Sequence, residues 1–87
     1  MPPEKYCMLH DTVELMTSED YKERFKAEYY QLKIRCMGLR NMVRRHIKGE
    51  LDFTPTCPMS TYDLQIRAME DYLAVLEARA VMEQIEL

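Results

Sequence analysis

The chain has 87 residues, of which 47% are hydrophobic and 31% are charged, and its formal net charge is −3 at pH 7. A chain of this length forms one small domain that buries only about 60–65% of its unfolded surface, so self-association is expected to add stability. No apolar run is long enough to span a membrane, and the first residues lack the pattern of a secretory signal. We therefore expect a single soluble domain, residues 1–87, without a membrane segment.

The first predicted element is a short helix or turn within an N-terminal segment, residues 1–17. A long helix is predicted to follow over residues 18–48. Thr17 or Ser18 is the expected N-cap of this helix, because a hydroxyl oxygen can accept a hydrogen bond from the unpaired N–H groups of the first turn. The acidic residues that come next stabilise this helix end, because negative charge interacts favourably with the positive N-terminal end of the helix dipole.

Gly49 is the expected end of the long helix, since glycine readily adopts the left-handed backbone of a helix C-terminus. A loop with two prolines is predicted over residues 49–59. A second long helix is predicted over residues 60–85, and Ser60 provides its start signal. No segment shows the alternating pattern of a β-strand.

Both long helices carry apolar residues at alternating steps of four and three. This spacing keeps an apolar stripe on one side of a helix and is typical of helices that pack side by side. In the first helix the stripe consists of Phe25, Tyr29, Leu32, Cys36, Leu39, Val43 and His46. In the second helix it consists of Tyr62, Ile66, Met69, Leu73, Leu76 and Ala80. The sequence therefore predicts an all-α fold, in which a short N-terminal helix precedes a long antiparallel helical hairpin.

The second helix carries a further apolar set that a two-helix hairpin leaves uncovered. Its members lie roughly 120–180° around the helix from the first stripe. They are Leu64, Ala68, Tyr72, Val75 and Met82. We expect the N-terminal segment to cover part of this face and another copy of the chain to cover the rest, because large exposed apolar patches usually mark interaction surfaces. The sequence thus predicts a homo-oligomer.

Basic residues gather on one side of the first helix, although the chain as a whole is acidic. On a helical wheel they form a cationic stripe beside the apolar stripe. Its members are Lys22, Lys26, Lys33, Arg40 and Arg44. Two interpretations are open. These side chains can cover the seam and pair with acids of the facing helix. Alternatively, they can form an anion site between subunits that binds phosphate, while Tyr29 or Met37 lies against a flat base.

Several other kinds of chemistry are not expected. The sequence pI of about 5.3 argues against binding to duplex nucleic acid, which usually needs a basic face. No nucleophile–base pair and no glycine-rich phosphate loop can be recognised, so we expect neither an enzyme nor a cofactor. Cys7, His10 and Cys57 are too scattered to predict a metal site.

The two helix patterns resemble a known family. The first helix contains ERFKAEYYQLKIRCMGLRNMV and the second contains DLQIRAMEDYLAVLEAR. Over about residues 18–85 these patterns resemble the small hairpin-domain proteins that phages encode as anti-CBASS and anti-Thoeris inhibitors. The resemblance implies a non-enzymatic sponge, typically a hexamer, that binds cyclic di- or trinucleotide messengers without cleaving them. It also implies a location in the cytoplasm of the infected bacterial host.

The resemblance further implies a set of site residues. Lys33 corresponds to the family's phosphate-binding lysine, and Arg67 or Arg79 replaces an arginine of the family's second helix. The family's base-stacking tyrosine has no aromatic counterpart at its expected position, so Tyr6 or Tyr21 is the expected substitute. With the residues from the helical wheel and the family pattern, the predicted phosphate contacts are Lys26, Lys33, Arg40, Arg67 and Arg79. The predicted base contacts are Tyr6, Tyr21, Tyr29 and Tyr72.

A second hypothesis remains open beside the sponge. The chain could be a helical protein-interaction module that inhibits a host protein through its exposed apolar seam. The two hypotheses differ in one property that can be measured, because only the sponge binds cyclic nucleotides. The preferred base and linkage of such a ligand do not follow from the sequence.

Overall fold

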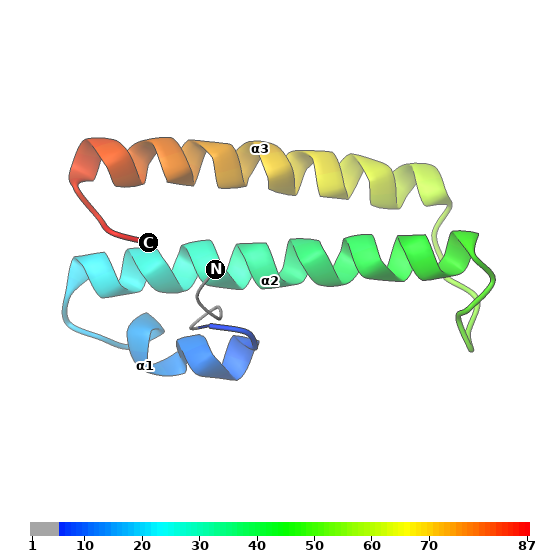
Figure 1. The fold of residues 1–87 in the computed structure, drawn as a ribbon, viewed down its shortest axis with the longest axis horizontal. Coiled ribbons are helices and arrows are strands. Elements are labelled where there is room, and N and C mark those ends of the chain that lie inside the picture. The colour runs from blue at the N-terminus through cyan, green and yellow to red at the C-terminus, as the bar shows by residue number, and fades with distance from the viewer. Residues whose placement is uncertain (1–5) are drawn as a thin grey trace.

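The computed structural model describes residues 6–87, and every regular element within them is helical (Figure 1). A 3-10 helix, η1 (Leu9–Thr12), leads directly into a short α-helix, α1 (Val13–Met16). Two long helices follow, α2 (Tyr21–Ile47) and α3 (Met59–Glu83). The predicted all-α class is confirmed. The first five residues of the predicted N-terminal segment lie outside the described residues.

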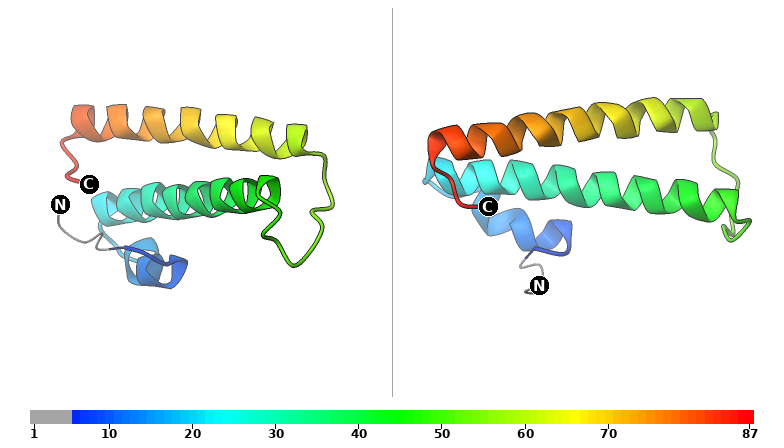
Figure 2. Two further views of the ribbon diagram at one scale, coloured as in Figure 1. Left: turned by 45° about the vertical axis from the view of Figure 1, so that its right-hand side comes forward. Right: turned by 45° about the horizontal axis from the view of Figure 1, so that its top comes forward.

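Helix α2 is the central element, with α3 along one side and η1 and α1 along another (Figures 1 and 2). Contacts between side chains show that α3 runs antiparallel to α2. Near one end the Tyr21 hydroxyl donates to the Glu83 carboxylate, and further along α2 the Arg40 guanidinium pairs with Glu70. We call the end where α2 begins and α3 finishes the terminal end, and the opposite end the loop end.

Helix α2 begins two to three residues later than the sequence suggested. Its N-cap is Asp20, whose carboxylate accepts a hydrogen bond of 3.0 Å from the Lys22 N–H. The expected caps are wrong because both hydroxyls have other partners. Thr17 donates back to the Val13 carbonyl at 3.0 Å, and the Ser18 hydroxyl accepts the Asp20 N–H at 3.0 Å. The turn before α2 is thereby stabilised by its own side chains.

Both long helices end in a left-handed residue. Gly49, with φ of 73°, follows α2 as the sequence predicted. At the end of α3 the left-handed residue is Gln84, with φ of 59°, which is unusual for a residue with a side chain. The Ile85 N–H then donates to the Ala80 carbonyl at 2.8 Å. This turn directs Ile85 back into the core, as expected for a helix-ending motif with a hydrophobic contact.

The hydrophobic core lies at the terminal end. It consists of Phe25, Tyr29, Leu76, Ala80 and Ile85, against which Tyr30, Leu32 and Leu73 pack. Leu76 is fully buried, and burial of such a side chain contributes about 1.5–3 kcal/mol. A smaller contact forms where α1 meets α2, with Leu15 and Ala27 both buried. By contrast, no residue from 37 to 75 is buried, so the loop end lacks a core of its own.

The second apolar set of α3 is exposed to solvent. Leu64 is 66% exposed and Met82 is 73% exposed. The N-terminal elements do not cover this face, because their backbone approaches α2 and not α3. The expectation that the N-terminal segment covers part of this face is therefore wrong, except that Tyr72 lines a groove together with Met16 of α1. The small side chain of Ala27 allows α1 to pack closely against α2 instead.

Within residues 6–87, no helix combines the length and the apolar character that a membrane span needs.

Candidate functional site

One side of α2 carries two half-buried lysines, Lys26 and Lys33, together with tyrosine rings. The rings of Tyr6 and Tyr30 have centroids 4.7 Å apart, and Tyr30 meets Tyr29 edge-on at 5.1 Å. The Lys33 Nζ lies 6.0 Å from the centre of the Tyr29 ring, at the outer limit of a cation–π contact. Lys26 precedes the two helical tyrosines by one turn, which places it on the same side of α2. We call these five residues the lysine–tyrosine cluster.

Tyr29 has a structural role within this cluster. Its side chain is only 6% exposed, and its hydroxyl donates to the Glu77 carboxylate of α3 at 2.8 Å. The ring therefore fills the seam between the two helices. Tyr6 and Tyr30 are half-buried, so part of their surface remains open to solvent.

Two of the three outer members of the cationic stripe have partners on α3 or just beyond its end. Arg40 forms an ion pair with Glu70, and Lys22 donates to the Gln84 carbonyl at 3.2 Å. The charge-paired interpretation is correct for Arg40, whereas the partner of Lys22 is a neutral backbone carbonyl just beyond α3. The Arg44 side chain is exposed and has no hydrogen-bond or ion-pair partner within the described part of the chain. The middle of the stripe, Lys26 and Lys33, is the part that lies beside the tyrosines.

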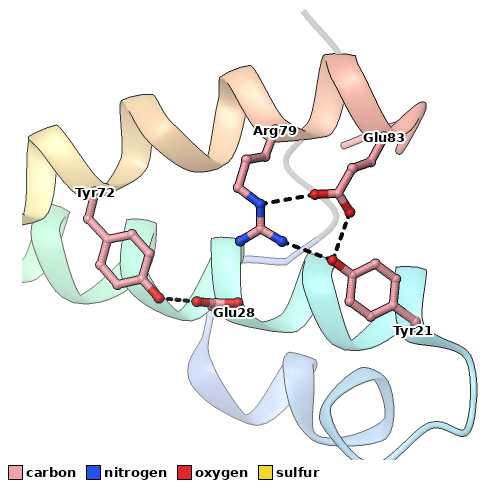
Figure 3. Close-up of polar contacts among 5 residues, drawn as sticks. All are labelled: Tyr21, Glu28, Tyr72, Arg79 and Glu83. Carbon is pink, nitrogen blue, oxygen red and sulfur yellow. Dashed lines mark hydrogen bonds and ion pairs between the residues drawn. The ribbon is translucent and has the colours of Figure 1, made fainter.

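A second set of polar residues lies at the terminal end, where Tyr21, Arg79 and Glu83 are hydrogen-bonded to one another (Figure 3). Arg79 donates through Nε to Glu83 at 2.9 Å and through a terminal nitrogen to the Tyr21 hydroxyl at 2.9 Å. The Tyr21 hydroxyl in turn donates to Glu83 at 2.7 Å, and the Arg79 guanidinium lies 5.1 Å from the Phe25 ring centre. Hydrogen bonds from Tyr21 and then Arg79 lower the pKa of Glu83. The hydrogen bond to the Glu83 carboxylate is the main cause that raises the pKa of Tyr21.

An open groove of about 380 Å³ lies on the other flank of α2, between α1 and α3. Its lining consists of Met16, Arg24, Ala27, Glu28, Gln31, Leu32, Arg35 and Tyr72. The Tyr72 hydroxyl donates to Glu28 across the groove, and this bond is the main cause that raises the pKa of Tyr72 (Figure 3). Arg24 donates to the Ser18 carbonyl at 2.7 Å. Among residues 6–87, Arg35 has no polar partner.

A protein-family model described as Sequestin matches residues 19–82, which include most of α2 and α3. The chain belongs to the Sequestin family. The match fits the resemblance to sponge-type anti-CBASS and anti-Thoeris proteins, and the family name indicates a protein that sequesters a ligand rather than an enzyme. No curated protein and no solved structure matches the chain.

In this Sequestin family member the nine predicted site residues lie in separate places. The structure places Lys33 beside Tyr29 and the Tyr6 ring beside Tyr30, and helical spacing puts Lys26 on the same side of α2. Tyr21 and Arg79 meet at the terminal end, and Tyr72 lines the groove. Arg40 is paired with Glu70. Arg67 is exposed on α3, apart from the others, and has no polar partner within the described part of the chain.

Sequence reasoning missed Tyr30 and the two groove arginines, Arg24 and Arg35, as candidate ligand contacts. Tyr30 follows Tyr29 directly and precedes Lys33 by three positions, so helical spacing could have placed it in the cluster. The arginines lie 11 positions apart on one side of α2, but only the packing of α1 reveals that a groove runs between them. No group of three potential metal ligands occurs among residues 6–87.

Proposed function

We propose that this chain is a phage antidefence protein that binds cyclic di- or trinucleotide messengers of bacterial immunity and holds them uncleaved. It would act in the cytoplasm of the infected host and block CBASS-type signalling. Sequestration needs only tight binding and enough protein, because a lower concentration of free messenger returns the effector to its unliganded state. Membership of the Sequestin family supports the sequestering role.

The observation that supports a nucleotide ligand best is the lysine–tyrosine cluster. Lys26 and Lys33 are both half-buried instead of being fully solvated, and Lys33 lies beside the Tyr29 ring. Ammonium groups form charge-assisted hydrogen bonds with phosphate, and tyrosine rings offer a surface for a flat base. We propose Lys26 and Lys33 as phosphate contacts, with Tyr6 and Tyr30 in contact with the base.

The remaining predicted contacts have weaker support. Arg40 and Arg79 can reach a phosphate only by leaving Glu70 and Glu83, so we propose structural roles for both arginines. Tyr21 belongs to the same bonded group as Arg79, and Tyr29 is buried. Tyr72 lines the groove on the opposite flank, where a ligand would meet Arg35 instead of Lys33.

The direct test is calorimetry with a panel of cyclic di- and trinucleotides. We expect at least one member to bind, and heat denaturation of the complex should release that nucleotide chemically intact. Binding to the folded state alone should also raise the melting temperature of the protein. A folded protein that binds no member of the panel would contradict the proposal, and a cleaved nucleotide would point to an enzyme.

Two charge reversals on α2 separate the lysine–tyrosine cluster from the groove. Lys33→Glu should weaken binding by about 10- to 100-fold, the loss expected for a hydrogen bond between charged groups. Arg35→Glu is the matched control, since it makes the same change two residues away on the other flank, and it should alter the affinity less than about twofold. A larger loss of affinity for Arg35→Glu than for Lys33→Glu would place the binding site in the groove. If Lys33→Glu changes the mass of the oligomer instead, Lys33 serves assembly.

The alternative function is that of a helical interaction module that inhibits a host protein. The exposed apolar face of α3 favours this candidate, because Leu64 and Met82 have no cover within the described chain. A binding isotherm with a cyclic nucleotide distinguishes the two functions, since the interaction module would give none.

A further inference from the structure

The two ends of the helix pair differ in how well they are packed. The terminal end holds the core around Leu76, whereas no residue from 37 to 75 is buried. The seam residues of the loop end, such as Val43 and Ile66, are only half-buried. Because burial of apolar surface is the main favourable term in folding, an isolated chain leaves this half weakly stabilised.

The side of α3 that points away from α2 is also apolar. Its exposed residues recur at steps of three and four along the whole helix. The apolar members are Leu64, Ala74, Val75, Ala78 and Met82. Two charged residues, Arg67 and Asp71, complete this row, which we call the outward face of α3. The spacing is that of a helix–helix seam, and the small alanine side chains permit another helix to approach closely.

Nothing within the described chain covers the outward face. The N-terminal elements pack on α2, and α2 occupies the opposite side of α3. A row of apolar residues along a helix of this length is normally buried against another helix. The partner must therefore come from outside residues 6–87.

The charges on the outward face indicate which partner fits. Arg67 and Asp71 have opposite signs, lie one turn apart and have no ion-pair partner among the described residues. A two-fold axis reverses the order of two identical helices, so it brings each arginine opposite the aspartate of the other copy. A face that holds one residue of each sign is thus complementary to itself.

We propose that the outward face of α3 binds the same face of a second copy, antiparallel, with Arg67 paired with the partner's Asp71. The axis then lies beside residue 69, midway between the two charges, and residues 59–79 of both helices overlap, so that Met82 lies beyond the contact. Leu64 meets the partner's Ala74 in this register, which sets a large side chain against a small one. This contact is the proposed interface between subunits of the homo-oligomer. It is expected to form whether or not a ligand is bound.

A charge-swap cycle tests the contact. Light scattering after gel filtration should show an oligomer for the natural protein, and Arg67→Glu should halve its mass or raise its dissociation constant by at least about tenfold. Asp71→Arg should have the same effect. The double variant Arg67→Glu with Asp71→Arg restores opposite charges across the axis, and it should recover the mass of the natural protein.

Controls make every outcome of this cycle informative. Arg35→Glu removes an exposed, unpaired arginine from α2 and should leave the mass unchanged. Circular dichroism should show full helicity for all variants, because each changed residue is exposed. A monomeric natural protein, or a double variant that fails to reassociate, would overturn the proposal. Cyclic-nucleotide binding is measured separately, so failure of the contact is distinguishable from failure of the proposed function.

Discussion

Glu83 is the residue on which the contacts of the terminal end converge. Tyr21 and Arg79 both donate hydrogen bonds to its carboxylate, and these bonds lower its pKa below the ordinary value of 4.5. A carboxylate whose pKa is lowered by folding stabilises the native state above its unfolded pKa. That contribution is lost as the pH falls through the folded pKa.

Replacing Glu83 should therefore have an effect that depends on pH. We expect Glu83→Gln to lower the free energy of unfolding at pH 7, and the difference from the natural protein to shrink as the pH falls below about 4.5. Urea denaturation at a series of pH values measures this difference. Glu86→Gln is the matched control, because Glu86 is exposed beyond the end of α3 and has no partner among the described residues. A loss for Glu83→Gln that stays constant from pH 7 to pH 3 would contradict the role of its charge.

At the scale of the helices, periodicity predicted the residues of the α2–α3 seam well. It predicted the packing of the N-terminal segment and the start of α2 poorly. Every residue of both predicted stripes is buried or half-buried, because alternating steps of three and four define one face of a helix whatever it packs against. The location of the N-terminal segment was predicted wrongly. Its apolar residues show that it packs on something, but not on which helix. The start of α2 was also missed, since Thr17, Ser18 and Asp20 all satisfy the local rule for an N-cap.

The candidate site was predicted in part for the same physical reason. A helical wheel places Lys26, Lys33 and Arg40 in one stripe, but it does not give the register between α2 and α3. That register decides that Arg40 meets Glu70, while Lys33 lies beside tyrosine rings. The groove beside Arg35 depends on three elements at once, and no single-helix pattern reports it.

The two helix ends give a matched pair of backbone predictions. Gln84 has φ of 59°, a conformation that costs a residue with a side chain about 1–2 kcal/mol and costs glycine little. Gln84→Gly should therefore raise the free energy of unfolding by about 0.5–1 kcal/mol, after the greater flexibility of glycine in the unfolded chain is subtracted. Gly49→Ala should lower it by about 1 kcal/mol, although a methyl group at Gly49 would meet no atom within 4 Å. Equal urea midpoints for the natural protein and both variants would show that neither conformation persists in solution.

At the scale of the whole molecule, the uneven core predicts uneven stability along the helix pair. Local opening costs least where few apolar contacts must be broken, which here is the loop end. In the dissociated Arg67→Glu variant, we expect amides of residues 39–46 and 62–70 to exchange hydrogen at least about tenfold faster than those of 25–36 and 76–83. Hydrogen exchange followed by mass spectrometry measures each segment.

The natural oligomer provides the comparison. A second copy on the outward face should slow exchange in residues 62–70 of α3 more than in residues 39–46 of α2, because the proposed contact lies on α3 alone. The segments around the core at the terminal end should change least, since Phe25 and Leu76 already bury them within one chain. Equal protection of both ends in the dissociated variant would mean that the loop end needs no partner. Slower exchange in α2 rather than α3 on assembly would assign the contact to the cationic side of α2.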